Sequence, residues 1–307
     1  MKRPRAEMSV DMTTDELRAR LGRVGIWMPP PERNGIDPAA TAAAIEQAGF
    51  TSVWVGGGNP DQAAFARLRA QLAASERLIV ATGIASVWAW EPAELRTAAE
   101  ALAADFPGRF ILGLGVSHAP SVEALGHAYR HPLAKMEKFL DELDHPAYHG
   151  AEHSLPPIVL AALGPKMLEL ARDRALGSHP YFTTPEHTRF AREVLGPEPL
   201  LIPELAFTLA SDTAEGAATA RAYADRYVKL PNYTRNLERF GFGAADFENA
   251  GSDRLISQVI PNGPAALGER IQSHLDAGAN HVVIQPLGPG GFTSVALTGL
   301  AEVVAGT

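Results

Sequence analysis

One turn of the chain combines small residues with a histidine. The stretch FPGRFILGLGVSHAP joins an apolar segment, 110–114, to Gly115, Val116, Ser117 and His118. A histidine side chain exchanges a proton near neutral pH, and small residues leave the backbone open to close approach by a ligand. The pattern predicts that this turn forms one wall of a cofactor site.

The residues that follow the other apolar segments are mostly small or aromatic. They include Trp27, Gly57, Ser86, Val87, Trp88, Trp90, Leu163, Gly164, Thr183 and Thr184. Bare backbone beside indole rings suits a flat aromatic cofactor, held by amides and packed by rings; tight turns with aromatic core residues are the alternative. Paired carboxylates are scarce here, and no hydrolase or phosphate-loop motif such as Gly-x-Ser-x-Gly, His-Glu-x-x-His or Gly-Lys-Thr occurs.

Two of these positions have the features of helix starts. Thr184 and Pro185 suit the N-cap and first turn of a helix, and Gly164 with Pro165 opens another helix in a similar way. Free amides at a helix N-terminus bind phosphate. The two openings therefore predict a site for a phosphate-bearing tail, with simple helix capping as the alternative.

Regularly spaced histidines raise the question of a metal site. Glu123, His127 and His131 follow i, i+4, i+8 spacing and would share one helix face. Gly126 weakens that helix, and Pro132 follows it at once. We expect a polar, partly exposed face there and no metal site. Three further histidines in a Pro- and Gly-rich connector are interpreted as loop residues: His145, His149 and His153.

Strand-like and helix-like segments alternate along the chain. Short, nearly continuous apolar runs are typical of strands buried on both faces of a parallel sheet. Eight such runs lie at 24–28, 52–55, 79–85, 110–114, 158–162, 179–182, 200–209 and 281–285. Helical patterns between them include 37–48, 93–104, 165–175 and 185–194. Eight alternations in 307 residues predict an α/β fold, a (β/α)8 TIM barrel, with a doubly wound sheet as the alternative.

Two connections are longer than the rest. The largest lies between the seventh and eighth runs and has a mostly helical pattern, so we interpret it as an insertion into the barrel. The expected domain organisation is a flexible N-terminal extension, 1–22, followed by a single domain, 23–307.

Composition restricts the class of partner. Hydrophobic residues make up 46% of the chain, charged residues 20%, and the net charge of -8 argues against binding nucleic acid. The absence of cysteine excludes disulfides, thiolate metal sites and a cysteine nucleophile. The sequence has no signal-peptide pattern and no apolar run near the roughly 18 residues that span a bilayer. We expect a cytoplasmic protein with a small-molecule substrate.

Several stretches together resemble the luciferase-like monooxygenase superfamily, in particular its branch that uses the deazaflavin coenzyme F420. These stretches are RVGIWMP, EQAGFTSVWVG, ATGIASVWAWEPAELRTAAEALAADFPGRFILGLGVSH, AALGPKMLELARDRALGSHPYFTTPEHT, LPNYTRNLERFGF and HLDAGANHVVIQPL. They extend over nearly the whole chain from Arg23. The resemblance implies a barrel that binds F420, or FMN as the alternative, and that forms a homo-oligomer such as a homodimer.

The resemblance also implies where the cofactor lies. In that family the third strand ends in a bulge with a non-prolyl cis peptide behind the middle ring, and the matching pair here is Ser86 and Val87. The positions along the ring system would be Gly115, Val116 and Ser117, those by the tail Leu163 and Gly164, and those near the phosphate Thr183 and Thr184.

His118 matches the position of a catalytic glutamate in the sugar-phosphate dehydrogenases of that family. It would exchange a proton with a substrate oxygen while a hydride moves at C5 of the ring, or it would only hydrogen-bond the loop or the cofactor. Those enzymes also carry a histidine or an acid after the second strand, where this chain has GGGN. We therefore expect a larger or more apolar substrate than a sugar phosphate, in a pocket walled by Trp27, Trp88 and Trp90 and bordered by Gly57.

The implied function is hydride transfer between F420 and a small organic substrate, either an alcohol or ketone or an activated alkene. An FMN-dependent luciferase-like monooxygenase is the first alternative. A non-catalytic flavin-binding barrel is the second.

Overall fold

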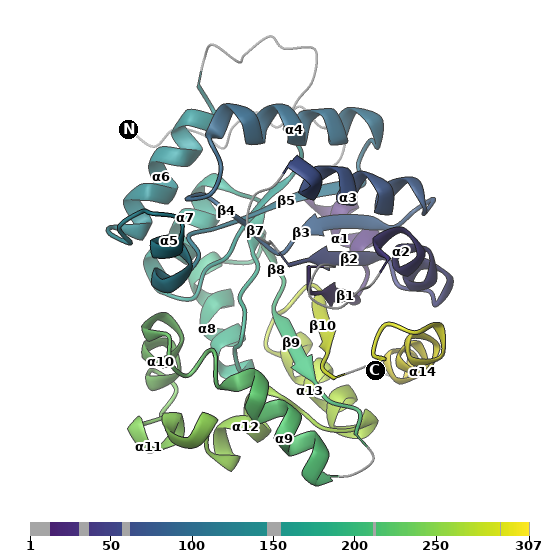
Figure 1. The fold of residues 1–307 in the computed structure, drawn as a ribbon, viewed down its shortest axis with the longest axis vertical. Coiled ribbons are helices and arrows are strands. Elements are labelled where there is room, and N and C mark those ends of the chain that lie inside the picture. Colours follow the sequence, from purple (N-terminus) through teal and green to yellow (C-terminus); the bar gives the residue numbers. More distant parts are fainter. Residues whose placement is uncertain are drawn as a thin grey trace.

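Parallel strands and helices alternate along the computed structural model of the chain (Figure 1). The structure describes residues 13–30, 37–56, 62–145, 155–210, 213–288 and 290–306. Gly57, His149 and His153, named above from the sequence, lie outside this part. The strands are β1 (Val24–Met28), β2 (Ser52–Val55), β3 (Ile79–Thr82), β4 (Ala85–Ser86), β5 (Phe110–Gly115), β6 (Ile158–Leu160), β7 (Gly177–Ser178), β8 (Leu200–Leu201), β9 (Glu204–Phe207) and β10 (Val282–Pro286).

The sheet closes on itself through one segment of the chain. The strands pair in the order β8-β7-β6-β5-β3-β2-β1-β10-β9, with β4 also on β5, and every pairing is parallel. Only Ile202 and Pro203 separate β8, which pairs with β7, from β9, which pairs with β10. One continuous segment thus joins both ends of the sheet. This confirms the TIM-barrel-like fold and excludes the doubly wound alternative.

Three of the predicted strands differ from those in the structure. The run 79–85 is divided into β3 and β4, and the run 200–209 is divided into β8 and β9. The predicted strand 179–182 is wrong, because β7 lies two residues earlier. Pro180 has no N–H to donate to a ladder, and Phe182 takes a left-handed φ of 54°, so the extended conformation ends there.

Helices surround the barrel, and the four predicted helical segments are confirmed. Those helices are α2 (Pro38–Gln47), α4 (Pro92–Asp105), α7 (Pro165–Arg174) and α8 (Pro185–Leu195). The others outside the insertion are α3 (Gln62–Ala73), α5 (Ala119–Ala124), α6 (Pro132–Leu143), α13 (Pro264–Asp276) and α14 (Ser294–Ala305). Many begin with proline, whose fixed φ suits the first helical turn and whose missing N–H costs nothing there.

Residues 13–22 do not form the predicted extension. They contain helix α1 (Thr14–Leu21), which begins with a capping box between Thr13 and Glu16. Leu17 and Leu21, one helical turn apart, are buried against residues inside the barrel such as Ile79. Helix α1 therefore packs on the barrel, and residues 1–12 of the expected extension lie outside the described residues.

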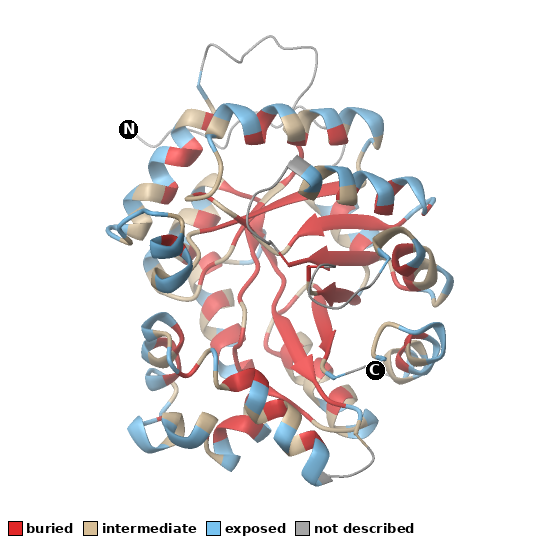
Figure 2. Ribbon diagram, viewed as in Figure 1, coloured by how far each residue is buried: buried red, intermediate tan, exposed pale blue. Residues whose placement is uncertain are grey.

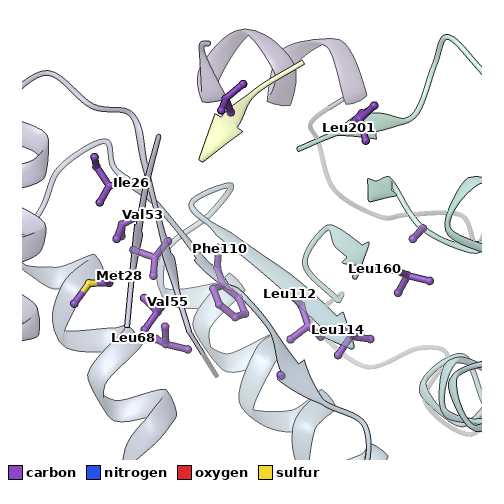
Figure 3. Close-up of a cluster of buried hydrophobic side chains, with 14 of the residues drawn as sticks. Ile26, Met28, Val53, Val55, Leu68, Phe110, Leu112, Leu114, Leu160 and Leu201 are labelled. Carbon is purple, nitrogen blue, oxygen red and sulfur yellow. The ribbon is translucent and has the colours of Figure 1, made fainter. Parts of the chain in front are cut away.

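Alternating side chains of the strands form two apolar layers. Those that point outward meet the helices, and Figure 3 shows Ile26, Met28, Val53, Val55, Phe110, Leu112 and Leu114 among them. Those that point inward fill the barrel, including Trp27, Trp54 and Ile111. Because both layers are buried, the strands are buried along nearly their whole length (Figure 2), with only Ser86 and Ile158 partly exposed.

The long connection after β9 is a helical insertion, as predicted. It contains α9 (Thr213–Ala224), α10 (Pro231–Glu238), α11 (Ala244–Phe247), η3 (Glu248–Ala250) and α12 (Asp253–Val259), which gather at one end of the molecule (Figure 1). Its apolar residues pack in one cluster with Phe182, which follows β7, and with Ala206 of β9. The insertion therefore packs against the barrel beside the carboxyl ends of its strands.

Candidate functional site

A β-bulge lies between β3 and β4, next to the turn that carries His118. Ala81 pairs with Ile111 and Ala85 pairs with Leu114, so four steps along one strand face three along the other. The extra residue lies near Gly83, and the non-prolyl cis peptide joins Gly83 to Ile84. The predicted location at Ser86 and Val87 is therefore wrong by three residues, because the bulge begins where β3 leaves its ladder and not at the end of the apolar run.

The glycines before His118 make room for this bulge. A Cβ atom on Gly113 would overlap the Thr82 carbonyl oxygen, and one on Gly115 would lie 2.5 Å from Cδ1 of Ile84. The Thr82 hydroxyl also bonds to both the N–H and the carbonyl of Gly113, at 2.8 Å each. The small residues of this strand are thus explained by packing within the barrel.

His118 lies at the N-cap of α5 under the insertion. Its ring is 5.3 Å from that of Tyr233 in α10, and the Asn232 side chain hydrogen-bonds it. The ring is half-buried, and Nδ1 has no hydrogen-bond partner within the described residues. Burial lowers the pKa of His118 more than the hydrogen bond that the ring donates to the Asn232 side chain raises it. At neutral pH His118 is therefore an uncharged base with one free nitrogen.

The other residues predicted for the cofactor ring lie at or just after the ends of β4 and β5. Val87 is fully buried in the core, and its N–H donates to the Gly115 carbonyl at 3.0 Å. Ser86 accepts the Trp88 N–H at 3.3 Å. Val116 and Ser117 are half-buried, and Ser117 has a left-handed φ of 56°.

Trp88 and Trp90 do not meet Trp27 in one pocket. Trp88 packs against Tyr129, at 6.0 Å between ring centroids, and Lys135 lies 5.3 Å from its ring. Trp90 meets the edge of Phe65 at 5.4 Å. These two indoles face α6 and α3, away from the cavity that Trp27 lines.

The two predicted helix openings lie side by side. Nε2 of His187 in α8 is 3.0 Å from the Leu163 carbonyl, which directly precedes the N-cap of α7, Gly164. No side chain caps the N-terminus of α7, whereas the Thr184 hydroxyl caps α8 by accepting the His187 N–H. The predicted pairing of the two openings therefore exists in the fold.

A positive charge and an unpartnered hydroxyl complete this group. A Cβ on Gly164 would lie 3.7 Å from the guanidinium nitrogens of Arg239, which follows α10. The Thr183 hydroxyl is buried and has no partner in the part of the chain that the structure describes. We call Gly164, Thr183, Thr184, His187 and Arg239 the helix-opening cluster. Free amides, a guanidinium and a hydroxyl suit a phosphate group.

A cavity of about 840 Å³ lies at the carboxyl ends of β1 and β10. Its walls are largely aromatic and apolar, and they include Trp27, Pro29, Pro30, Tyr181, Tyr223, Tyr227, Pro286, Leu287 and Phe292. Gln285 also lines it, and Arg226 and Asp37 lie at exposed positions of its wall. A pocket of this size and composition fits a drug-sized apolar molecule.

Behind the cavity wall lies a buried acid in a hydrogen-bonded cluster with three tyrosines. Glu204 is 1% exposed, and burial raises its pKa to about 8, although the Phe182 N–H and the Tyr223 hydroxyl bond to it. The Tyr223 hydroxyl in turn lies 2.7 Å from that of Tyr181, and the Tyr181 hydroxyl donates to Gln285 at 2.6 Å.

None of these residues was among those predicted from sequence. The one available signal for Glu204 was its position as an acid within the apolar run 200–209. Charged residues are rarely buried in a strand unless they are paired or functional. Gln285 is the last polar residue of the eighth run, at the end where barrel sites form. The tyrosines had no local signal, because α9 and the loop after β7 meet only in the folded chain.

The family model of luciferase-like monooxygenases matches residues 24–254. The chain belongs to the luciferase-like monooxygenase family. It is similar to the solved coenzyme F420-dependent tetrahydromethanopterin reductase of Methanopyrus kandleri, with 15% identity, 93% of this chain and 99% of that chain covered, and a TM-score of 0.73.

Other solved members of this fold use either coenzyme. An F420-dependent secondary alcohol dehydrogenase bound to an F420-acetone adduct has 16% identity, 92% and 99% coverage and a TM-score of 0.65. The oxygenating constituent of 3,6-diketocamphane monooxygenase of Pseudomonas putida, bound to FMN, has 14% identity, 92% and 96% coverage and a TM-score of 0.67. At these identities the likeness is one of fold, and membership of the luciferase-like monooxygenase family supports an enzyme of the oxidoreductase class.

Two further findings concern metals and membranes. Helix α5 ends at Ala124, so Glu123, His127 and His131 do not share one helix, and the described residues contain no group of three potential metal ligands. Within the same ranges, no helix combines the length and the apolar character needed to pass through a bilayer.

Proposed function

We propose that this luciferase-like protein is an F420-dependent oxidoreductase that transfers a hydride between the deazaflavin and a small organic substrate. The observation that carries the proposal is the helix-opening cluster, which offers α7 amides, Arg239 and an unpartnered Thr183 hydroxyl to a phosphate-bearing tail. The predicted ring contacts lie on the neighbouring loops, at Ser86, Val87, Gly115, Val116 and Ser117. The F420-using neighbours and the sequence resemblance favour F420 over FMN.

In this proposal the chain's own residues bind the cofactor and move one proton. F420, when bound, supplies or accepts the hydride. In the direction of alcohol oxidation, the His118 imidazole takes the hydroxyl proton of the substrate; in the direction of ketone reduction it returns that proton to the oxygen. Its lowered pKa keeps it neutral and ready to accept a proton at pH 7.

The test is a paired titration of the purified protein with F420 and with FMN, followed by tryptophan fluorescence. Preference for F420 in the micromolar range supports the proposal. Preference for FMN favours the monooxygenase alternative, and failure to bind either favours the non-catalytic barrel. Light scattering of the same sample tests the proposed homodimer, and cell fractionation tests the proposed cytoplasmic location.

Replacing Arg239 should weaken the binding of F420 at the phosphate end. We expect Arg239→Gln to raise the Kd about tenfold or more, the usual effect of losing a charge-assisted hydrogen bond. Arg235→Gln, on an exposed position of the same helix, is the matched control and should leave the Kd unchanged. Equal effects of the two variants would remove Arg239 from the site.

Replacing His118 should affect turnover far more than cofactor binding. We expect His118→Ala to lower kcat by about 10²–10⁴, the contribution of general acid–base catalysis, and to leave the Kd for F420 within about twofold. Stopped-flow absorbance of the deazaflavin measures both quantities. If kcat is retained, His118 is only a loop or cofactor contact.

A further inference from the structure

The hydrogen bonds of the buried cluster have a defined direction. Each tyrosine hydroxyl has one proton to donate. Tyr181 gives its proton to Gln285 Oε1 at 2.6 Å, and the shortest contact of the Tyr223 hydroxyl is to Tyr181 at 2.7 Å. Tyr227 also donates to Tyr181, at 3.3 Å. The chain of donors therefore runs from Tyr223 through Tyr181 to Gln285.

Glu204 sets this direction at its other end. Its Oε1 atom lies 3.4 Å from the Tyr223 hydroxyl, and its side chain is buried among residues that carry no full charge. Since its pKa is raised to about 8, the acid is uncharged at neutral pH and is a weak acceptor for the Tyr223 proton, which goes to the nearer Tyr181 oxygen at 2.7 Å. An ionised Glu204 would instead accept the Tyr223 proton, and the chain would reverse.

The direction of the chain orients the amide of Gln285. Its Oε1 atom accepts from Tyr181 at 2.6 Å and lies 3.1 Å from the Tyr223 hydroxyl. Nε2 has no hydrogen bond to any residue that the structure describes, and the side chain lines the cavity. The two N–H groups of Gln285 Nε2 are therefore available as donors at the end of β10. A ligand that pairs with them needs an acceptor oxygen.

The rest of the cavity selects against charge. Aromatic rings and prolines form much of its wall, with Trp27 5.5 Å from Tyr181 between ring centroids, and Thr41, Thr293 and Ser294 add hydroxyl groups. Arg226 and Asp37 bring one charge of each sign to the exposed part, and the Asp37 carboxylate already caps α2 through the Ala39 and Ala40 N–H groups. An open, mainly apolar wall with balanced charges favours a neutral ligand.

We propose that this cavity is a binding subsite for a neutral, apolar ring compound whose carbonyl oxygen accepts a hydrogen bond from Gln285 Nε2. Tyr227 and Tyr233 lie in ring contact between Tyr181 and His118, so the oxygen held here is not the one that exchanges a proton with His118. Gln285 thus determines specificity and takes no part in proton transfer. Binding of a ligand at this subsite does not depend on the proposed function. The further claim that the subsite selects the substrate of the oxidoreductase rests on the proposed function.

The experiment measures binding to the full chain without any cofactor, by calorimetry at pH 7. The probes are 2-decalone and 2-methylenedecalin, which have nearly the same shape and differ in the acceptor oxygen. We expect wild type to bind the ketone about tenfold more tightly, the effect of one hydrogen bond. Gln285→Met should abolish this preference, whereas Ser294→Ala, at another position of the cavity wall, should retain it. Equal binding of the two probes by wild type overturns the proposal.

A second variant keeps the test decisive if Gln285→Met folds poorly. The preference for the ketone should decline in wild type as the pH rises through about 8, because an ionised Glu204 attracts the Tyr223 proton, and stay constant in Glu204→Gln, whose amide does not ionise. The titratable and charged groups around Glu204 are Tyr181, Tyr223, Tyr227, Tyr233 and, on the far side of Tyr227, Arg226. Burial raises the pKa of each tyrosine, so all four stay neutral over this range. A preference that does not change with pH in wild type overturns the proposed orientation of Gln285. If the ketone preference is found but F420 does not bind, the subsite stands and the proposed function fails.

Discussion

Gly113→Ala should destabilise the barrel by at least about 3 kcal/mol, or prevent folding, which is the largest effect we expect of a single methyl group in this chain. The new Cβ would overlap the Thr82 carbonyl oxygen, an atom of the backbone that has no rotamer to change. To remove this overlap, the bulge between β3 and β4 would have to shift, which would break the two hydrogen bonds between the Thr82 hydroxyl and Gly113. Urea unfolding followed by circular dichroism measures the loss.

Gly299→Ala provides the matched control. Gly299 lies within helix α14, and a Cβ there would meet no atom within 4 Å. Because alanine is a better helix former than glycine, this variant should gain about 0.5–1 kcal/mol. If the free energy of unfolding of Gly113→Ala lies within about 1 kcal/mol of the wild-type value, the bulge can move to accept the methyl group and this explanation is wrong.

The stability of the protein should depend on pH with a maximum near pH 7, where the opposing effects of four buried histidines and one buried glutamate balance. On the alkaline side the cause is Glu204, whose pKa is about 8 in the folded protein against an ordinary 4.5. Its contribution to stability is fully present below pH 4.5 and is lost as the pH rises through 8. A difference of this size corresponds to about 5 kcal/mol in total.

On the acidic side the cause is a set of buried histidines. Burial lowers the pKa to about 4 for His179, His187 and His281 and to about 3 for His274, against an ordinary value of 6.5. These groups stay neutral in the folded protein while the unfolded chain binds protons. Stability is therefore present above pH 6.5 and is lost as the pH falls toward 4.

Thermal or urea unfolding across pH 4–9 tests both arms of this profile. Glu204→Gln should flatten the alkaline arm, since the amide does not ionise, and leave the acidic arm in place. His127→Gln, at an exposed histidine, is the control and should change neither arm. An alkaline arm that survives in Glu204→Gln would mean that Glu204 is not the group responsible.

The sequence predicted the parts of the fold that depend on neighbouring residues, such as apolar runs and helix starts. Strands β1 and β2 are continuous apolar runs and were predicted to the residue, and the helices α2, α4, α7 and α8 begin at prolines. The bulge was misplaced, because one extra residue is visible only when β3 and β4 are paired with β5. Strand β7 was misplaced, because Pro180 and Phe182 interrupt an apolar run without changing its hydrophobicity.

The candidate site divides in the same way. The helix openings at Gly164 and Thr184 were predicted because capping depends on neighbouring residues. The cluster around Glu204 was not, because Tyr181 and Gln285 are 104 positions apart in the chain and meet only through barrel closure. Trp88 and Trp90 follow the same strand but face different helices, which hydrophobicity alone does not distinguish.

The insertion contributes residues to every part of the site. Helix α9 and the turn after it supply Tyr223 and Tyr227 to the cavity, α10 supplies Tyr233 beside His118, and the residue after α10, Arg239, lies over Gly164. The barrel strands supply the bulge and the side chains of Trp27, Glu204 and Gln285. One segment, 213–259, thus reaches the cavity, His118 and Gly164, while closure of the sheet depends on residues outside it. Substitutions confined to this segment should therefore change ligand choice, the surroundings of His118 and anion binding without opening the barrel.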